Sequence, residues 1–141
     1  MFALDTNVVF ELRKAKVGKA YKQVSAWAAG VPAATMYVSV ITILELETGV
    51  LLVQRRDAAQ GALLWSWLDQ HVLPAFAERV LPVDTAVARR YVALHVPARC
   101  AKREALIAAT ALVHGRTVVT RKVADFAGTH VALINPWETP L

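Results

Sequence analysis

Short segments of aliphatic and β-branched residues alternate with longer alanine-rich segments, and this alternation constrains the fold more than any other feature of the chain. The expected strands are residues 2–4, 36–38, 79–82, 117–119 and 131–134. Strands separated by helical segments are typical of a wound α/β domain. Because the crossovers between such strands are right-handed, helices cover both faces of a mostly parallel sheet. We therefore expect an α/β fold with four or five short strands.

The intervening segments carry helix start and stop signals. Expected helices are residues 8–15, 19–29, a segment through Glu45 to about residue 55, 57–72, 84–95 and 102–114. Ser39 or Thr42 is the expected N-cap of the third. Pro74 is expected to end the fourth helix, and Gly115 to end the last.

Composition narrows the class of partner. The 141 residues fit one domain, residues 1–141, and 56% of them are hydrophobic, enough for a sizeable core. The formal net charge of +5 and the pI of about 9.7 favour a polyanionic partner, nucleic acid first.

Cysteine use and the first residues bear on location. Cys100 is the only cysteine, which excludes an intrachain disulfide and fits a reducing cytoplasm. An acid at position five and the lack of a basic leader argue against a signal peptide. The longest apolar run is too short and too interrupted to span a bilayer, so we expect a cytoplasmic protein.

Four acids recur at strand ends or helix starts: Asp5, Glu45, Glu104 and Asp125. A parallel sheet brings such positions to one edge, where open α/β sheets place their chemistry. Clustered carboxylates repel one another, and a hard divalent cation such as Mg²⁺ or Mn²⁺ relieves that repulsion. The bound ion can activate water and stabilise the charge that develops on a scissile phosphate. The four acids together therefore predict a metal site.

Each acid also has a structural explanation. Asp5 is a candidate N-cap for the helix after it, and Glu45 and Glu104 would each complement a helix dipole. Asp125 would serve as a loop cap. On the functional interpretation, Asn7 orients the Asp5 carboxylate and the hydroxyl of Thr120 binds a metal-bound water.

Ordered motifs over essentially the whole chain resemble the PIN-domain family of metal-dependent nucleases, and within it the VapC-type toxins. The matching pieces are Leu4-Asp5-Thr6-Asn7-Val8, Ser39-Val40-Ile41-Thr42-Ile43-Leu44-Glu45-Leu46, Leu106-Ile107-Ala108-Ala109-Thr110-Ala111 and Val119-Thr120-Arg121. The pieces Val72-Leu73-Pro74-Ala75-Phe76 and Ile134-Asn135-Pro136-Trp137 are similar to the FitB-like branch.

The resemblance implies a three-layer α/β/α sandwich and metal-dependent endoribonuclease activity. It implies the toxin role in a toxin–antitoxin system, with RNA as substrate, a VapB- or FitA-like antitoxin as partner and a homodimer as the usual assembly. The implied catalytic acids are Asp5, Glu45, Glu104 and Asp125. Of these, Asp5, Glu104 and Asp125 are the implied ligands of Mg²⁺ or Mn²⁺. Lys102, Arg103, Arg121 and Lys122 are candidate RNA contacts.

Two positions depart from the family pattern and keep other functions open. Glu104 stands where the family nearly always has aspartate, and Lys122 stands where it usually has asparagine or aspartate. A degenerate member that binds an antitoxin, and DNA through it, without cutting RNA is therefore the alternative. An aspartyl-phosphate phosphatase is disfavoured because Asn7 replaces the second aspartate it needs.

Overall fold

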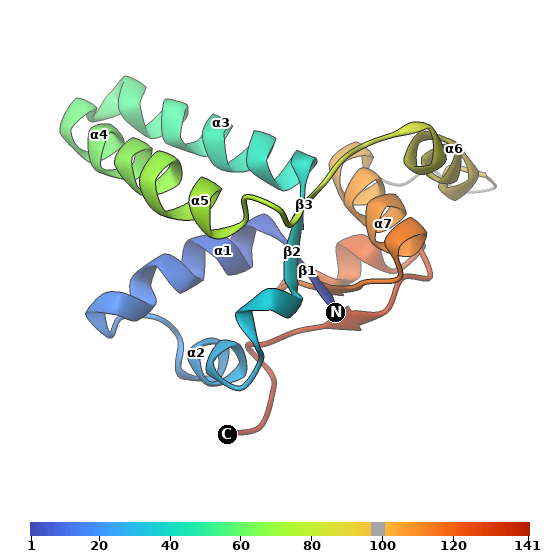
Figure 1. Cartoon of the computed structure of the whole chain (residues 1–141), viewed down its shortest axis with the longest axis horizontal. Coiled ribbons are helices and arrows are strands. Elements are labelled where there is room, and N and C mark those ends of the chain that lie inside the picture. Colours follow the sequence, from blue (N-terminus) through green and yellow to red (C-terminus); the bar gives the residue numbers. More distant parts are fainter. Residues whose placement is uncertain (97–100) are drawn as a thin grey trace.

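A five-stranded parallel sheet forms the centre of the molecule (Figure 1). The structure, a computed structural model, describes residues 1–96 and 101–141, so Cys100 lies outside the described residues. The strand order is β3-β2-β1-β4-β5. The strands are β1 (Phe2–Leu4), β2 (Met36–Ser39), β3 (Val80–Leu81), β4 (Thr117–Val119) and β5 (Leu133–Ile134). The expected parallel α/β sheet is confirmed, and the first and fourth strands have the expected bounds.

The helices occupy the segments between the strands. They are α1 (Thr6–Arg13), α2 (Lys22–Ala29), α3 (Val40–Arg56), α4 (Ala58–Trp67), α5 (Leu73–Ala75), α6 (Thr85–Leu94) and α7 (Lys102–His114). Shorter helical turns are η1 (Lys14–Val17), η2 (Ala33–Thr35), η3 (Leu68–Val72) and η4 (Val123–Phe126).

Local signals explain where several helices begin and end. Of the two expected caps for α3, Ser39 is the one used, because its hydroxyl accepts the Ile41 N–H at 3.1 Å. Thr42 is one turn further on and donates to the Leu4 carbonyl instead. Gly115 ends α7 at a φ of 66°, a left-handed conformation that glycine adopts without strain.

Pro74 does not end its helix as expected. The chain passes through the π-helical turn η3 and continues as α5, in which Pro74 occupies the first turn. The wider π turn just before it accommodates the proline ring, and a first-turn residue needs no N–H donor.

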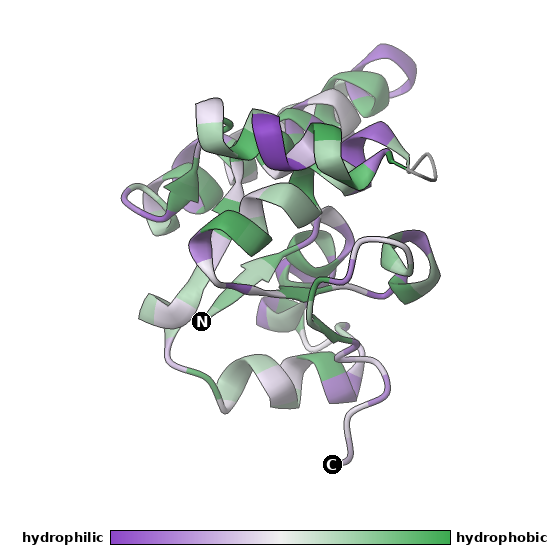
Figure 2. Cartoon of the chain, turned by 90° about the vertical axis from the view of Figure 1, so that its right-hand side faces the viewer, coloured by the Kyte–Doolittle hydropathy of each residue, from purple (hydrophilic) through white to green (hydrophobic). Residues whose placement is uncertain are grey.

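Two packing clusters lie on opposite faces of the sheet because successive strand residues point to opposite sides. Leu4 and Val119 join a cluster with residues of α1, α3 and α4, including Val8, Leu46 and Leu64. Their strand neighbours face the other way, where they pack against α7, in a cluster of Ala3, Ile107, Ala108, Ala111, Val118, Phe126 and Val131. Figure 2 shows green and pale strands, and helices along which purple, white and green stretches alternate. The sheet therefore has helices on both faces.

Among the described residues, none of the helices combines the length and the apolar character that crossing a bilayer requires.

Candidate active site

The carboxyl ends of β1, β2 and β4 meet at one edge of the sheet. From β1, the chain winds through β2 to β3 on one side, and β4 then pairs with β1 on the other side. The strand order therefore switches direction between β1 and β4, and ligands of open α/β sheets bind outside such a switch point. Asp5 immediately follows β1, and Thr120 immediately follows β4.

The Asp5 carboxylate is buried and fixed by three donors. Its side chain accepts the Thr6 N–H at 2.8 Å on one oxygen. Its other oxygen accepts the Thr120 hydroxyl at 2.8 Å and the Asn7 amide at 3.1 Å. Asp5 is 5% exposed, and its backbone N–H donates to the Val119 carbonyl. The capping role expected of Asp5 is real, but the cap uses one oxygen and the other is turned toward β4.

Asn7 joins the two sides of the switch point. Its amide donates to Asp5, as expected, and lies 3.4 Å from the Thr120 hydroxyl, while its side-chain oxygen accepts the Arg121 N–H at 3.1 Å. Thr120 is fully buried, and its hydroxyl also accepts the Lys122 N–H at 3.0 Å. The hydroxyl that the sequence interpretation assigned to a metal-bound water donates to the Asp5 carboxylate.

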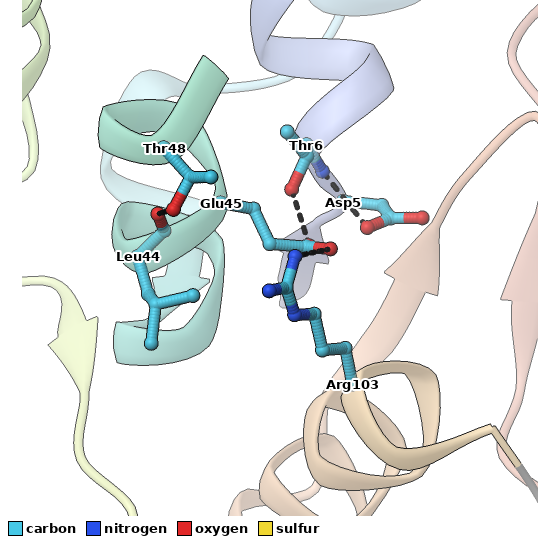
Figure 3. A network of polar contacts seen from close by, with 6 residues as sticks. All are labelled: Asp5, Thr6, Leu44, Glu45, Thr48 and Arg103. Carbon is cyan, nitrogen blue, oxygen red and sulfur yellow. Dashed lines mark hydrogen bonds and ion pairs between the residues drawn. The ribbon is translucent and has the colours of Figure 1, made fainter. Parts of the chain in front are cut away.

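Glu45 extends from α3 toward the same place (Figure 3). One of its oxygens accepts the Thr6 hydroxyl at 2.7 Å, and the other lies 3.8 Å from the Arg103 guanidinium of α7. The Glu45 side chain is 19% exposed and that of Arg103 is 53% exposed. Thr6 thus connects the Asp5 loop to α3, and Arg103 connects α3 to α7.

Three acids line one pocket of ≈ 230 Å³. Asp5, Glu45 and Glu104 share its wall with Thr6, Asn7, Phe10 and Lys122. Glu104 lies in the first turn of α7, where it also complements the helix dipole. We refer to this cavity as the acidic pocket. Its polar wall is dominated by oxygen donors, the class that Mg²⁺ and Mn²⁺ prefer.

Asp125 does not reach the acidic pocket, and the expected convergence of four acids is wrong in this respect. It is exposed in the first turn of η4, and its N–H donates to the Lys122 carbonyl. The reason is the short turn after Thr120, which buries Phe126 as the apolar anchor and leaves Asp125 on the outside. Within residues 1–96 and 101–141, no three Asp, Glu, His or Cys side chains are close enough to hold one ion. The expected metal set of Asp5, Glu104 and Asp125 is therefore not formed.

The four cations expected to contact RNA differ in their position relative to the acidic pocket. Lys122 lines it, and the Arg103 guanidinium lies 3.8 Å from a carboxylate oxygen of Glu45. Arg121 is exposed and lies over the Trp137 ring, with 5.3 Å between its guanidinium carbon and the ring centroid. Lys102 is exposed at the start of α7.

Thr6 is a site residue that the sequence interpretation missed. It lies next to Asp5, and a hydroxyl beside a strand-end acid is the signal that would have found it. The Arg103–Glu45 pair had no such signal, because its members are 58 positions apart and belong to different helices.

Comparison with known proteins identifies the family to which this geometry belongs. The family model described as PIN domain matches residues 2–122. VapC ribonuclease Y4jK of Sinorhizobium fredii is 39% identical, over 98% of this chain and 99% of that protein. Toxin FitB of Neisseria gonorrhoeae is 36% identical, over 97% of this chain and 99% of that protein.

The fold has close counterparts among solved structures. The crystal structure of FitAcB from Neisseria gonorrhoeae superposes with a TM-score of 0.89 at 35% identity, over 99% of this chain and 100% of that one. FitAB bound to an IR36 DNA fragment superposes with a TM-score of 0.88 at 33% identity, over 100% and 99%. With a family match over most of its length and relatives above 30% identity over nearly all of it, the chain belongs to the PIN domain family.

Proposed function

We propose that this protein is an endoribonuclease that uses Mg²⁺ or Mn²⁺, and that it is the toxin of a cytoplasmic toxin–antitoxin pair. The observation that carries the proposal is the acidic pocket, in which Asp5, Glu45 and Glu104 meet at the switch point of a PIN-domain sheet. Relatives that are 36–39% identical over nearly the whole chain are named a ribonuclease and a toxin.

The residues of the acidic pocket fit a hydrated divalent cation. Mg²⁺ is usually bound by one or two carboxylates, while waters and substrate oxygens complete its coordination. Asp5 and Glu104 would hold it, and Glu45 lines the same pocket. Asp5 suits this role because its carboxylate is buried, fixed by neutral donors and turned toward β4. When bound, the ion would activate water and stabilise the charge developing on the scissile phosphate.

The other residues of the site would position the reacting groups. Asn7 and Thr120 prevent the Asp5 carboxylate from rotating, because each donates to the same oxygen. Thr6 does the same for Glu45. Lys122 lines the pocket with a cation that would contact a phosphate oxygen of the RNA.

A protein partner follows from the same relationship. The solved structures FitAcB and FitAB, the latter with DNA, superpose on nearly the whole of this chain. We propose that an antitoxin of the VapB or FitA type binds this protein, and that the toxin itself forms a homodimer.

A second candidate is a binding module that pairs with an antitoxin but cleaves no RNA. Two observations favour it: Arg103 already neutralises one oxygen of Glu45, and Lys122 adds a further cation to the pocket. Both cations oppose the entry of a dication by Coulomb repulsion.

The deciding experiment is RNA cleavage by the purified protein with Mg²⁺ or Mn²⁺, for the wild type, Asp5→Asn and Asp84→Asn. Asp84 caps α6 through the Val87 N–H, and asparagine caps a helix equally well, so Asp84→Asn is a matched control. We expect Asp84→Asn to cleave like the wild type and Asp5→Asn to lose at least about a hundredfold in rate, in line with the loss of one charged catalytic group. Intact RNA in every reaction, together with equal toxicity of wild type and Asp5→Asn on expression, would leave the binding module as the function.

A further inference from the structure

A second pocket, of ≈ 590 Å³, lies beside the acidic pocket and has the opposite charge. Its wall combines four cations with two aromatic rings: Lys14, Lys19, Lys22, Arg121, Tyr21 and Trp137. All four cations are exposed, and Tyr21 is 50% exposed. We call this cavity the basic pocket. A cationic wall with accessible rings is the combination that holds phosphates and stacks bases.

The basic pocket is built by a tight reversal of the chain after α1. Gly18 has a φ of 69°, and the Lys19 N–H donates back to the Lys14 carbonyl. Glu11 then fixes the returning segment of chain, because one of its oxygens accepts the Tyr21 N–H at 3.0 Å and the other pairs with Lys14 at 3.3 Å. Both oxygens of Glu11, the acid in the pocket wall, are thus occupied by contacts within the protein. The cations therefore dominate the charge that a ligand would meet.

The far wall of the basic pocket comes from the end of the chain. Asn135 accepts the Trp137 N–H at 3.0 Å, which fixes the turn that follows β5. The Arg121 guanidinium lies over the Trp137 ring, so a planar cation and a planar ring form one platform. Nucleic-acid bases stack on both aromatic rings and guanidinium planes.

Asn7 and Arg121 connect the basic pocket to the acidic one. Asn7 donates to the Asp5 carboxylate and accepts the backbone N–H of Arg121, whose side chain lines the basic pocket. Asn7 lines the acidic pocket itself. The two cavities are therefore neighbours, and an RNA strand whose phosphate enters one can place a neighbouring nucleotide in the other.

We propose that the basic pocket binds a nucleotide of single-stranded RNA next to the scissile phosphate, with its base on the Trp137–Arg121 platform and its phosphates on Lys19 and Lys22. This assignment rests on the proposed ribonuclease function and adds a substrate class to it. A base must be unstacked from its neighbours to use such a platform, so single-stranded segments bind and duplex does not.

The first test is binding of a fluorescein-labelled single-stranded RNA oligonucleotide in EDTA, where no metal-dependent cleavage occurs. The variant Lys19→Glu/Lys22→Glu is compared with Arg89→Glu/Arg90→Glu. The second variant carries the same change of charge on exposed residues of α6, across the sheet from α2 (Figure 1). We expect the Lys19/Lys22 variant to bind at least tenfold more weakly. Its salt slope should fall by about 1.4, or about 0.7 for each phosphate that the protein no longer neutralises. The Arg89/Arg90 variant should stay within about threefold of the wild type, because α6 does not line the basic pocket and salt screens charges between separated surface sites.

The second test separates stacking from charge. Trp137 also packs against the core, so Trp137→Leu and Trp137→Phe are compared, with thermal unfolding to verify that both are folded. Phenylalanine keeps a ring and should bind RNA within about threefold of the wild type. Leucine keeps apolar packing but offers no ring, so the affinity of this variant should fall by about 5- to 140-fold, the range that loss of one base–aromatic stack gives.

Three outcomes would overturn the inference: equal losses in the two charge-reversal variants, equal affinity of Trp137→Leu and Trp137→Phe, or equal binding of a duplex RNA. A fourth outcome would overturn it as well: labelled poly-glutamate whose binding is weakened as much as RNA binding by the change of Lys19 and Lys22. The basic pocket would then be a binding surface for acidic protein segments. Because binding is measured without metal, these outcomes are distinct from failure of the nuclease proposal. If the wild type cuts no RNA but binds it through Lys19, Lys22 and Trp137, the proposed role of the basic pocket stands and the proposed nuclease activity is refuted.

Discussion

Replacing Thr120 by valine tests how far the geometry of the acidic pocket depends on one hydroxyl. Thr120 is fully buried, and its hydroxyl donates to the Asp5 carboxylate at 2.8 Å and accepts the Lys122 N–H at 3.0 Å. A hydrogen bond to a charged group contributes about 1.5–3 kcal/mol. Valine has the same shape and removes that bond, so the free energy of unfolding should fall by about this amount.

The expected change in melting temperature follows from the size of the chain. The entropy of unfolding of 141 residues is about 0.3 kcal/mol/K, so a loss of about 1.5–3 kcal/mol lowers the melting temperature by about 5–10 °C. Differential scanning calorimetry at a fixed protein concentration measures it directly. RNA cleavage should fall as well, because the Asp5 carboxylate is then free to rotate.

Thr110 offers a matched control for this substitution. It is also fully buried, but its hydroxyl donates to the Leu106 carbonyl of its own helix at 2.7 Å. That acceptor is neutral and already takes a helical hydrogen bond, so Thr110→Val should cost less than about 1 kcal/mol. If Thr110→Val were as destabilising as Thr120→Val, the larger contribution of the Thr120–Asp5 hydrogen bond to the free energy of unfolding would be refuted.

Three further substitutions follow from the structure. Glu104→Gln should abolish metal-dependent RNA cleavage, whereas Glu104→Asp, which keeps the carboxylate, should retain it; equal rates for the two variants would exclude a role for the charge. Gly61→Ala should lower the free energy of unfolding by about 3 kcal/mol in denaturant titrations, because the added Cβ would lie 2.4 Å from the Gln54 Cα, and backbone cannot move aside cheaply. Arg103→Gln should change stability by less than about 0.5 kcal/mol, since the pair with Glu45 is half-exposed. The same variant should bind Mg²⁺ more tightly by calorimetry, because the cation paired with Glu45 has been removed, and unchanged affinity would show that Arg103 does not oppose the ion.

Most of the fold could be predicted because its signals are local. Strands β1 and β4 are short apolar or β-branched runs, and Ser39, Asp84 and Gly115 mark helix ends with side chains or backbone freedom specific to those positions. Pro74 misled the prediction because the π-helical turn that accommodates it has no sequence signature in a single chain.

The site was predictable in part for the same reason. Asp5 follows a recognisable strand, so its place at the sheet edge follows from parallel topology alone. Asp125 lies six residues beyond β4, and the path of those residues is decided by burial of Phe126, which spacing does not reveal. The basic pocket joins the turn after α1 to the end of the chain, and only tertiary structure brings Trp137 to Tyr21.

The bond between Thr120 and Asp5 spans 115 positions of the chain. During synthesis on the ribosome, Asp5 emerges among the first residues and Thr120 among the last, and domains fold as their parts become available. A nascent polypeptide therefore has an incomplete acidic pocket until translation has nearly ended. On the proposed function, the protein therefore cannot cleave RNA while its own chain is still being elongated.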